Sequence, residues 1–192
     1  MLGFVPCRAI LGLAALITLA ASCETKPGPG SDEGAGTAET AECEPASIID
    51  HQQWQTVEAA ADPRADHRPD PVECGIAGWY IENDLLEIDT NYCNYLALRQ
   101  PSLVAIEAGQ TVGLGMYHFD LVAPEPALAH VAVYVEGQLL WEDSVEIPGA
   151  AKVYLEEIES PFRIGVGDEV VFHLHNHGQN TWVLQELTLV CP

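Results

Sequence analysis

The sequence has few basic residues. Only 7 of its 192 residues are Lys or Arg, against 29 Asp and Glu, and the formal net charge is −22. Nucleic-acid phosphates are bound by clustered Lys and Arg, so the sequence argues against nucleic acid as a partner. It also lacks the Walker loop, the G-x-G-x-x-G, H-E-x-x-H and G-x-S-x-G motifs, and any paired C-x-x-C. Because no catalytic set can be named, we do not expect an enzyme.

A long apolar run is missing as well. The run at the N-terminus, residues 9–21, has 13 residues, whereas a helix needs about 20 to cross a membrane. Residues 1–22 instead have the size and the small-residue ending of a secretory signal peptide. If this is an ordinary signal peptide, its removal leaves Cys23 free or in a disulfide bond.

The end of the signal segment, Leu19-Ala20-Ala21-Ser22-Cys23, resembles the lipobox of bacterial lipoproteins. The resemblance implies that cleavage occurs before Cys23 and that Cys23 then carries acyl chains such as palmitate. Several acyl chains give a stable membrane anchor. The resemblance therefore implies a lipid-anchored protein of the bacterial cell envelope, and Glu24 after the cysteine favours the outer membrane.

The segment that follows has almost no large apolar side chains. Residues 23–46 are rich in Gly, Pro, Ser, Thr and acidic residues, which predicts a flexible, disordered acidic tether. Residues 47–71 predict a lead-in with one short helix over 47–61, capped by Ser47, followed by a stretch with three prolines. We expect the folded domain to span residues 72–192.

The cysteines indicate an oxidising compartment. Cys7 leaves with the signal peptide and the lipid occupies Cys23, so four remain. An even number in an exported chain predicts two disulfides with three possible pairings. We prefer Cys74–Cys93 together with Cys43–Cys191. A thiolate metal site is disfavoured because no pair has C-x-x-C spacing.

Residues 85–192 show short runs of alternating apolar and polar residues separated by turn residues, and this pattern is typical of strands. The expected fold is all-β, a two-sheet antiparallel sandwich. The expected strands are Leu85–Asp89, Tyr95–Leu98, Ser102–Ile106, Thr111–Leu121, Leu128–Glu136, Gln138–Ile147, Ala151–Glu156, Pro161–Ile164, Glu169–His175 and Thr181–Val190.

Two segments repeat the pattern x-Gly-polar-polar-Val before a strand, residues 108–112 and 166–170. Together with the closing strands, they resemble the jelly-roll sandwiches of carbohydrate-binding modules and galactose-binding-like domains. The resemblance implies a non-catalytic module that binds a glycan or a partner protein. Alternation assigns one face of each strand to the core: Val112, Leu114 and Met116, and Val170, Phe172 and Leu174.

The segment Phe172-His173-Leu174-His175-Asn176-His177 carries the densest histidine pattern. On a strand, His173 and His175 point to one face about 7 Å apart, which suits two ligands of one Cu or Zn ion. His177, His130 or His118 would be the third ligand. The string resembles the H-x-H copper signature of copper/zinc superoxide dismutases, but no His or Asp follows His177, so we do not expect dismutase activity. Without a metal, these histidines form a polar face that is pH-sensitive or contacts a sugar.

Exposed aromatic residues are the second candidate site, because sugar rings stack on Trp and Tyr. We expect a patch formed by Trp182, Tyr134, Tyr117 and Asn180. Three hypotheses result: a glycan- or protein-binding module with no cofactor, a copper- or zinc-binding envelope protein, and a structural envelope protein without a small ligand.

Overall fold

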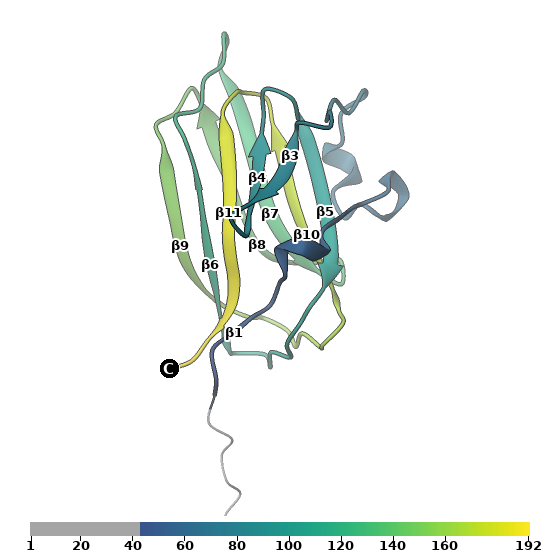
Figure 1. The fold of residues 1–192 in the computed structure, drawn as a ribbon, viewed down its shortest axis with the longest axis vertical. Helices are drawn as coiled ribbons and strands as arrows, with labels where there is room; N and C mark the ends of the chain where they lie inside the picture. The colour runs from purple at the N-terminus through teal and green to yellow at the C-terminus, as the bar shows by residue number, and fades with distance from the viewer. Residues whose placement is uncertain (1–42) are drawn as a thin grey trace, which may run out of the picture. The chain divides into compact units, whose positions relative to one another are not determined.

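The computed structural model describes residues 43–192. Within these residues it contains eleven strands and three short 3-10 helices, all in one compact unit (Figure 1). The predicted signal peptide, the lipidation site Cys23 and most of the predicted tether lie outside the described residues. Among the residues described, no helix is long and apolar enough to span a membrane.

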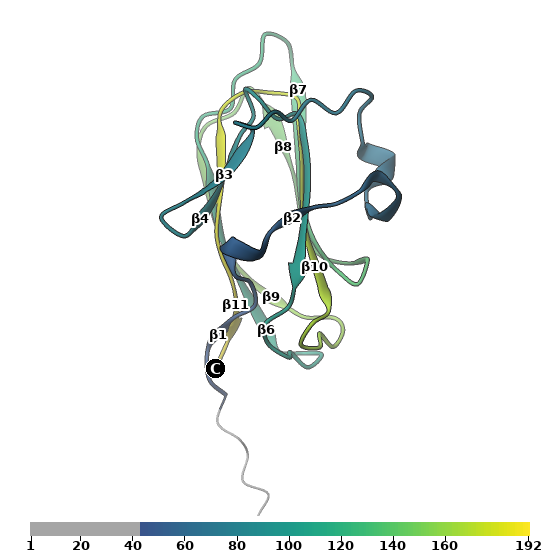
Figure 2. The ribbon, with the colours of Figure 1, turned by 45° about the vertical axis from the view of Figure 1, so that its right-hand side comes forward.

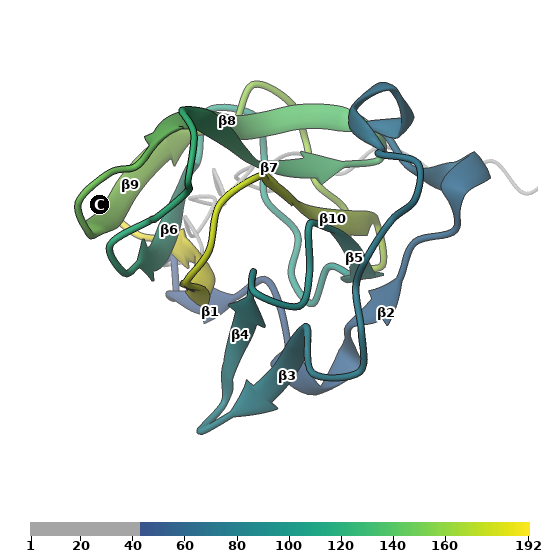
Figure 3. The same cartoon turned by 90° about the horizontal axis from the view of Figure 1, so that it is seen from above.

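The strands form two antiparallel sheets, which confirms the all-β sandwich. The first sheet has the order β3 (Trp79–Glu82), β4 (Leu85–Asp89), β11 (Thr181–Val190), β6 (Thr111–His118) and β9 (Lys152–Glu159), with β1 (Ala46–Ser47) beside the far end of β11. The second has the order β2 (Gln55–Thr56), β5 (Tyr95–Pro101), β10 (Glu169–Asn176), β7 (Ala127–Val135) and β8 (Gln138–Ile147). Figure 3 shows both sheets from above.

The core lies between the sheets, and the expected faces of β6 and β10 contribute to it. Val112, Leu114 and Met116 are buried there, as are Val170, Phe172 and Leu174. Burying one such side chain contributes about 1.5–3 kcal/mol. The opposite face of β10 carries Val171, His173 and His175, so this alternation determines which side of the sheet holds the histidines.

The β7–β8 hairpin fixes which residues of these two strands face each other. Its two loop residues, Glu136 and Gly137, both have positive φ, 49° and 72°, as a type I′ turn requires. Further along, the hairpin places His130 opposite Ser144.

The predicted start of the sandwich at residue 72 is wrong, because residues 46–56 belong to both sheets. β1 pairs with β11 and β2 pairs with β5, so this segment crosses from one sheet to the other. Ile48, Ile49 and Trp54 fill the core where it crosses. The predicted helix over 47–61 is also absent from the described chain: β1, β2 and the 3-10 helices η1 (His51–Gln53) and η2 (Ala59–Ala61) take its place. The side chain that caps η1 is Asp50 rather than Ser47.

Residues 57–72, here called the strap, cover the outer face of the second sheet. The strap contains η2 and η3 (Ala65–His67), and Figure 2 shows it outside the sheet of β5 and β10. Val57 and Val72 at its ends pack with Tyr95, Tyr134 and Val171 of that sheet. Because apolar groups cover the sheet on both faces, the inner strands β7 and β10 are almost continuously buried.

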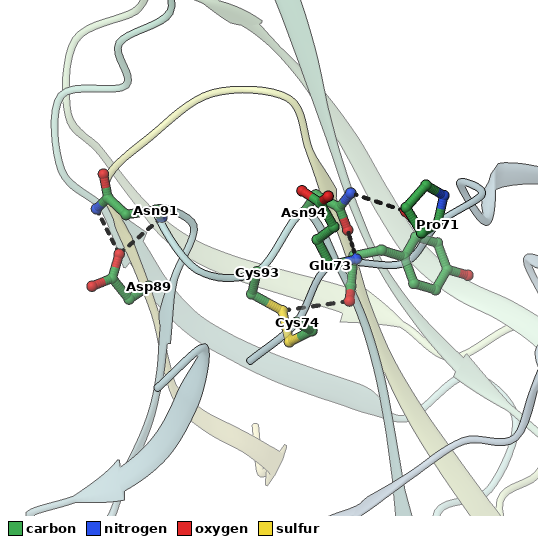
Figure 4. The surroundings of a disulfide bond; sticks show 8 residues. Pro71, Glu73, Cys74, Asp89, Asn91, Cys93 and Asn94 are labelled. Atoms are coloured by element: carbon green, nitrogen blue, oxygen red, sulfur yellow. Dashed lines mark hydrogen bonds between the residues drawn. A yellow bond between two sulfur atoms is a disulfide. The ribbon is translucent and has the colours of Figure 1, made fainter. Parts of the chain in front are cut away.

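Both expected disulfides are confirmed. Cys43 bonds to Cys191 and Cys74 bonds to Cys93. Around the second bond, the Glu73 amide donates to Asn94 Oδ1 over 2.9 Å (Figure 4). The two bonds hold the chain just before β1 and just after the strap.

Other expected elements differ in extent. The segments Ser102–Ile106 and Pro161–Ile164 form only a single bridge, Ile106 to Ile164. β3 lies before the first expected strand, which began at Leu85.

Candidate functional site

The outer face of the second sheet carries two adjacent rows of side chains beneath the strap. The pairing of β5, β10, β7 and β8 places the following residues side by side: Tyr95, His175, His130 and Ser144 in one row, and Ala97, His173, Ala132 and Glu142 in the next. Because both strand neighbours of His173 are the small residues Ala97 and Ala132, larger rings from other positions can approach the His173 ring.

Three histidines converge here, and we call them the histidine cluster: His67 of η3, His130 of β7 and His173 of β10. One ring nitrogen from each lies within 4.8 Å of the others. The ring of His67 lies 4.8 Å from that of His130 and 6.0 Å from that of His173, measured between centroids. The strap thus supplies one member of the cluster and the sheet supplies two.

The imidazole nitrogens of the cluster are poorly paired within the described chain. His173 is fully buried, and neither of its ring nitrogens has a hydrogen-bond partner in residues 43–192. Nε2 of His130 lies 2.9 Å from the Glu142 carboxylate, and its Nδ1 is buried without a partner in the same residues. An unpaired buried polar group costs about 1–3 kcal/mol, so three such atoms in one place require an explanation.

Positive charge is disfavoured on two rings of the cluster, His67 and His173, and on the nearby His175. Burial, with the neighbouring His130 and His67, lowers the pKa of His173 to about 2. Burial and the adjacent His177 lower the pKa of His175 to about 4. Burial also lowers the pKa of His67, with a further contribution from the Arg64 guanidinium. At neutral pH the rings of His67, His173 and His175 are therefore neutral, and each has a lone pair available to a metal.

Arg64 is the cation nearest to the cluster. Its Nη2 lies 3.1 Å from Nδ1 of His67 and also contacts Nε2 of that ring. Its Nε lies 3.6 Å from the Asp66 carboxylate. The guanidinium thus competes for the lone pair of His67.

A buried carboxylate fastens the strap above the cluster. Asp62, whose side chain is 0% exposed, accepts hydrogen bonds from the Tyr95 hydroxyl over 2.5 Å and from Arg68 over 3.1 Å. Its other oxygen accepts from the Arg64 amide over 2.9 Å. Burial and the Asp62 carboxylate raise the pKa of Tyr95, so the hydroxyl keeps its proton.

A groove of about 910 Å³ adjoins the cluster at one end of the sheet. His67 and His130 line it as well. Its apolar side consists of Pro126, Ala127, Leu128, Ile147 and Pro148, and its polar side adds Asp66, Ser144, Glu146, His175 and His177. A volume of 300–1,000 Å³ is typical of small-molecule sites.

The expected histidine set is only partly brought together. His173 and His130 belong to the cluster, whereas His175 and His177 line the groove, with rings 4.3 Å apart. His118 is buried on the first sheet, where its ring packs on Trp182. Sequence reasoning missed His67 because it lies in a proline-rich stretch without a strand or helix pattern.

The predicted aromatic patch is wrong. Trp182 is 0% exposed within the core, and Tyr134 is 4% exposed beneath the strap on the other sheet. Tyr117 lies on the outer face of the first sheet, where it contacts Phe119. Asn180 has a φ of 123°, and its side-chain amide donates to the Asp120 carbonyl over 2.7 Å. Tyr134 does lie on the outer face of its strand, as the alternation predicted, but the strap covers that face and buries the side chain.

No protein-family model matches the sequence, and no curated protein matches it. Several solved structures are similar. One is described as "CBM4 structure and function", with 13% identity, a TM-score of 0.38, and coverage of 78% of this chain and 95% of that one. Another, "Family 16 Carbohydrate Binding Module-2", has 16% identity, a TM-score of 0.34, and coverage of 64% and 89%. A CBM61 structure in complex with β-1,4-galactotriose has 12% identity, a TM-score of 0.34, and coverage of 78% and 88%. These low values carry no conclusion about what this chain binds.

Proposed function

We propose that this chain is a non-catalytic binding module that takes an uncharged, polyhydroxylated ligand, a glycan, in the groove beside the histidine cluster. The observation that carries the proposal is the groove itself, because its lining combines apolar and polar residues in one concavity of about 910 Å³.

The charges of the groove favour a neutral ligand. Asp66 and Glu146 line it, and no Lys or Arg is among its lining residues in the described chain. An anionic ligand would therefore meet repulsion, whereas hydroxyl groups can donate to the two carboxylates and to imidazole nitrogens. Ser144 adds a hydroxyl that both donates and accepts.

The apolar residues of the groove suit the C–H faces of a sugar ring. Leu128 and Pro148 are exposed in the groove, and such groups pack against the C–H faces of pyranose rings, which are apolar. The lining holds no Trp or Tyr among the described residues. The rings that can stack on a sugar in this groove are therefore those of His175 and His177.

A glycan array with the oxidised protein, followed by calorimetry with the best ligand, tests this proposal. Ser144→Ala removes a hydroxyl and Glu146→Gln replaces a charged acceptor with a weaker neutral one, so together they should weaken binding about 10-fold. Glu157→Gln is the matched control, since Glu157 is exposed on β9 of the other sheet. A protein that binds no glycan, or one whose affinity is the same in all three variants, contradicts the proposal.

The lipid anchor belongs to the proposed function as well. The residues Leu19-Ala20-Ala21-Ser22-Cys23 support acylation at Cys23, which would hold the module at the bacterial outer membrane. Mass spectrometry of the mature N-terminus tests the anchor, and Cys23→Ser should release the protein from the membrane fraction. A wild-type N-terminus without lipid contradicts the anchor and leaves the groove unaffected.

A further inference from the structure

We propose that the histidine cluster is a binding site for a transition-metal dication, Zn²⁺ or Cu²⁺, with His67, His130 and His173 as ligands. The proposal does not require the glycan proposal, because it rests on the ring nitrogens of the cluster, of which His67 and His130 also line the groove. It also differs from the expected H-x-H site, since only one of its ligands comes from that motif.

The spacing of the ring nitrogens is close to what a metal needs. A tetrahedral ion with metal–nitrogen bonds of about 2.0–2.1 Å holds its ligand nitrogens about 3.3 Å apart. The three nitrogens lie within 4.8 Å of one another in this structure. Rotation of the His67 side chain, which is only partly buried, would close the difference.

The unpaired ring nitrogens of the cluster also favour a metal ion as the ligand. Both nitrogens of the buried His173 and Nδ1 of His130 lack partners in residues 43–192, and a bound cation would pair one nitrogen of His173 and Nδ1 of His130. Neutral imidazole is the ligand type that Zn²⁺ and Cu²⁺ share. A buried site with three imidazoles does not suit Ca²⁺ or Mg²⁺, which take oxygen ligands.

Glu142 adds a second, independent feature of such sites. Its carboxylate lies 2.9 Å from Nε2 of His130, so that nitrogen carries the proton and Nδ1 presents its lone pair to the cluster. Ligand histidines are commonly oriented by a carboxylate in this way, and the loss of that carboxylate typically lowers metal affinity 10–100-fold.

The surrounding charges decide how strongly the site binds. Two carboxylates adjoin the ligand rings, Glu142 at His130 and Asp66 at 3.8 Å from Nε2 of His67. They favour a dication. Arg64 opposes it, because its guanidinium must leave His67 before that ring can bind a metal. Three protein ligands leave a fourth position on the ion.

Calorimetric titration of the metal-free, oxidised protein with Zn²⁺ and, separately, with Cu²⁺ tests the proposal. We expect one ion per chain with a Kd in the micromolar range or tighter. His67→Ala is the decisive variant, because His67 lies on the strap and is only partly buried. It should weaken binding at least 100-fold, while the melting temperature of the metal-free protein stays close to that of the wild type.

His177→Ala is the matched control, since His177 lines the groove outside the cluster. Its Kd should stay within threefold of the wild type, whereas Glu142→Gln should raise the Kd about 10-fold. Absence of binding, or equal binding by His67→Ala and the wild type, overturns the proposal. A loss in His177→Ala that matches the loss in His67→Ala also overturns it. Glycan titration of the metal-free protein tests the proposed function separately.

Discussion

The hydroxyl of Tyr95 donates a 2.5 Å hydrogen bond to the carboxylate of Asp62 and so ties the strap to β5. Tyr95→Phe removes this bond and leaves a buried carboxylate with one partner fewer. We expect a loss of about 1–3 kcal/mol in the free energy of unfolding, together with faster protease cleavage in residues 57–72. Urea denaturation and limited proteolysis measure the two effects. Tyr92→Phe is the control, because Tyr92 is exposed. If both variants behave alike, the bond does not fasten the strap.

Arg64 contacts the ring of His67, and its removal should strengthen metal binding. Arg64→Ala frees the lone pair of His67 and removes a like charge from the neighbourhood of the ion. We expect Zn²⁺ affinity to rise about 10-fold, or about 1.4 kcal/mol. Arg163→Ala makes the same change in net charge at a pair with Glu107 on the surface and should leave the affinity unchanged. Equal affinity in Arg64→Ala and Arg163→Ala would contradict the competition.

The stability of the metal-free protein should fall as the pH falls below 6.5. The folded protein holds His173 neutral, with a pKa near 2, whereas the unfolded chain takes up a proton at about 6.5. The unfolded state therefore binds more protons between these values, and acid favours it. At pH 5 the contribution of His173 is on the order of 2 kcal/mol.

Urea denaturation of wild type and His173→Leu from pH 4.5 to 7.5, in the presence of EDTA, measures this effect. The variant should lose stability less steeply with falling pH, by about one proton. Parallel curves would show that His173 is not held neutral in the folded protein.

Trp182 belongs to the core, so its replacement should affect stability rather than ligand binding. Trp182→Ala should cost about 3–5 kcal/mol, because it removes a fully buried side chain that packs on His118. The indole fluorescence of Trp182 should resist acrylamide quenching. Ready quenching in a variant that keeps only this tryptophan would show that the residue is exposed.

The alternation of single strands predicted the core of the sandwich, because period-2 burial is a local property of the sequence. It assigned Phe172 to the core and His173 to the outer face, and both assignments hold. The cysteine count predicted two disulfides, and the preferred pairing is the one that the structure contains.

What covers the outer face could not be predicted in the same way. The strap has no periodic pattern, and contacts with strands more than thirty residues away, such as Asp62 with Tyr95, hold it in place. Its placement buries Tyr134 and brings His67 to His130. The candidate site is therefore formed by a long-range contact that pattern reading does not detect.

The bond between Cys43 and Cys191 also determines the response of the domain to force. A pull on the chain before Cys43 passes through this bond to the end of β11, the longest strand of the first sheet. β11 is held in turn by its pairing with β6. Because the disulfide runs in parallel with the backbone that continues from Cys43 into β1, it diverts load from β1 and the strap. A protein tethered at its N-terminus can thus be stretched by its surroundings without peeling His67 away from the sheet.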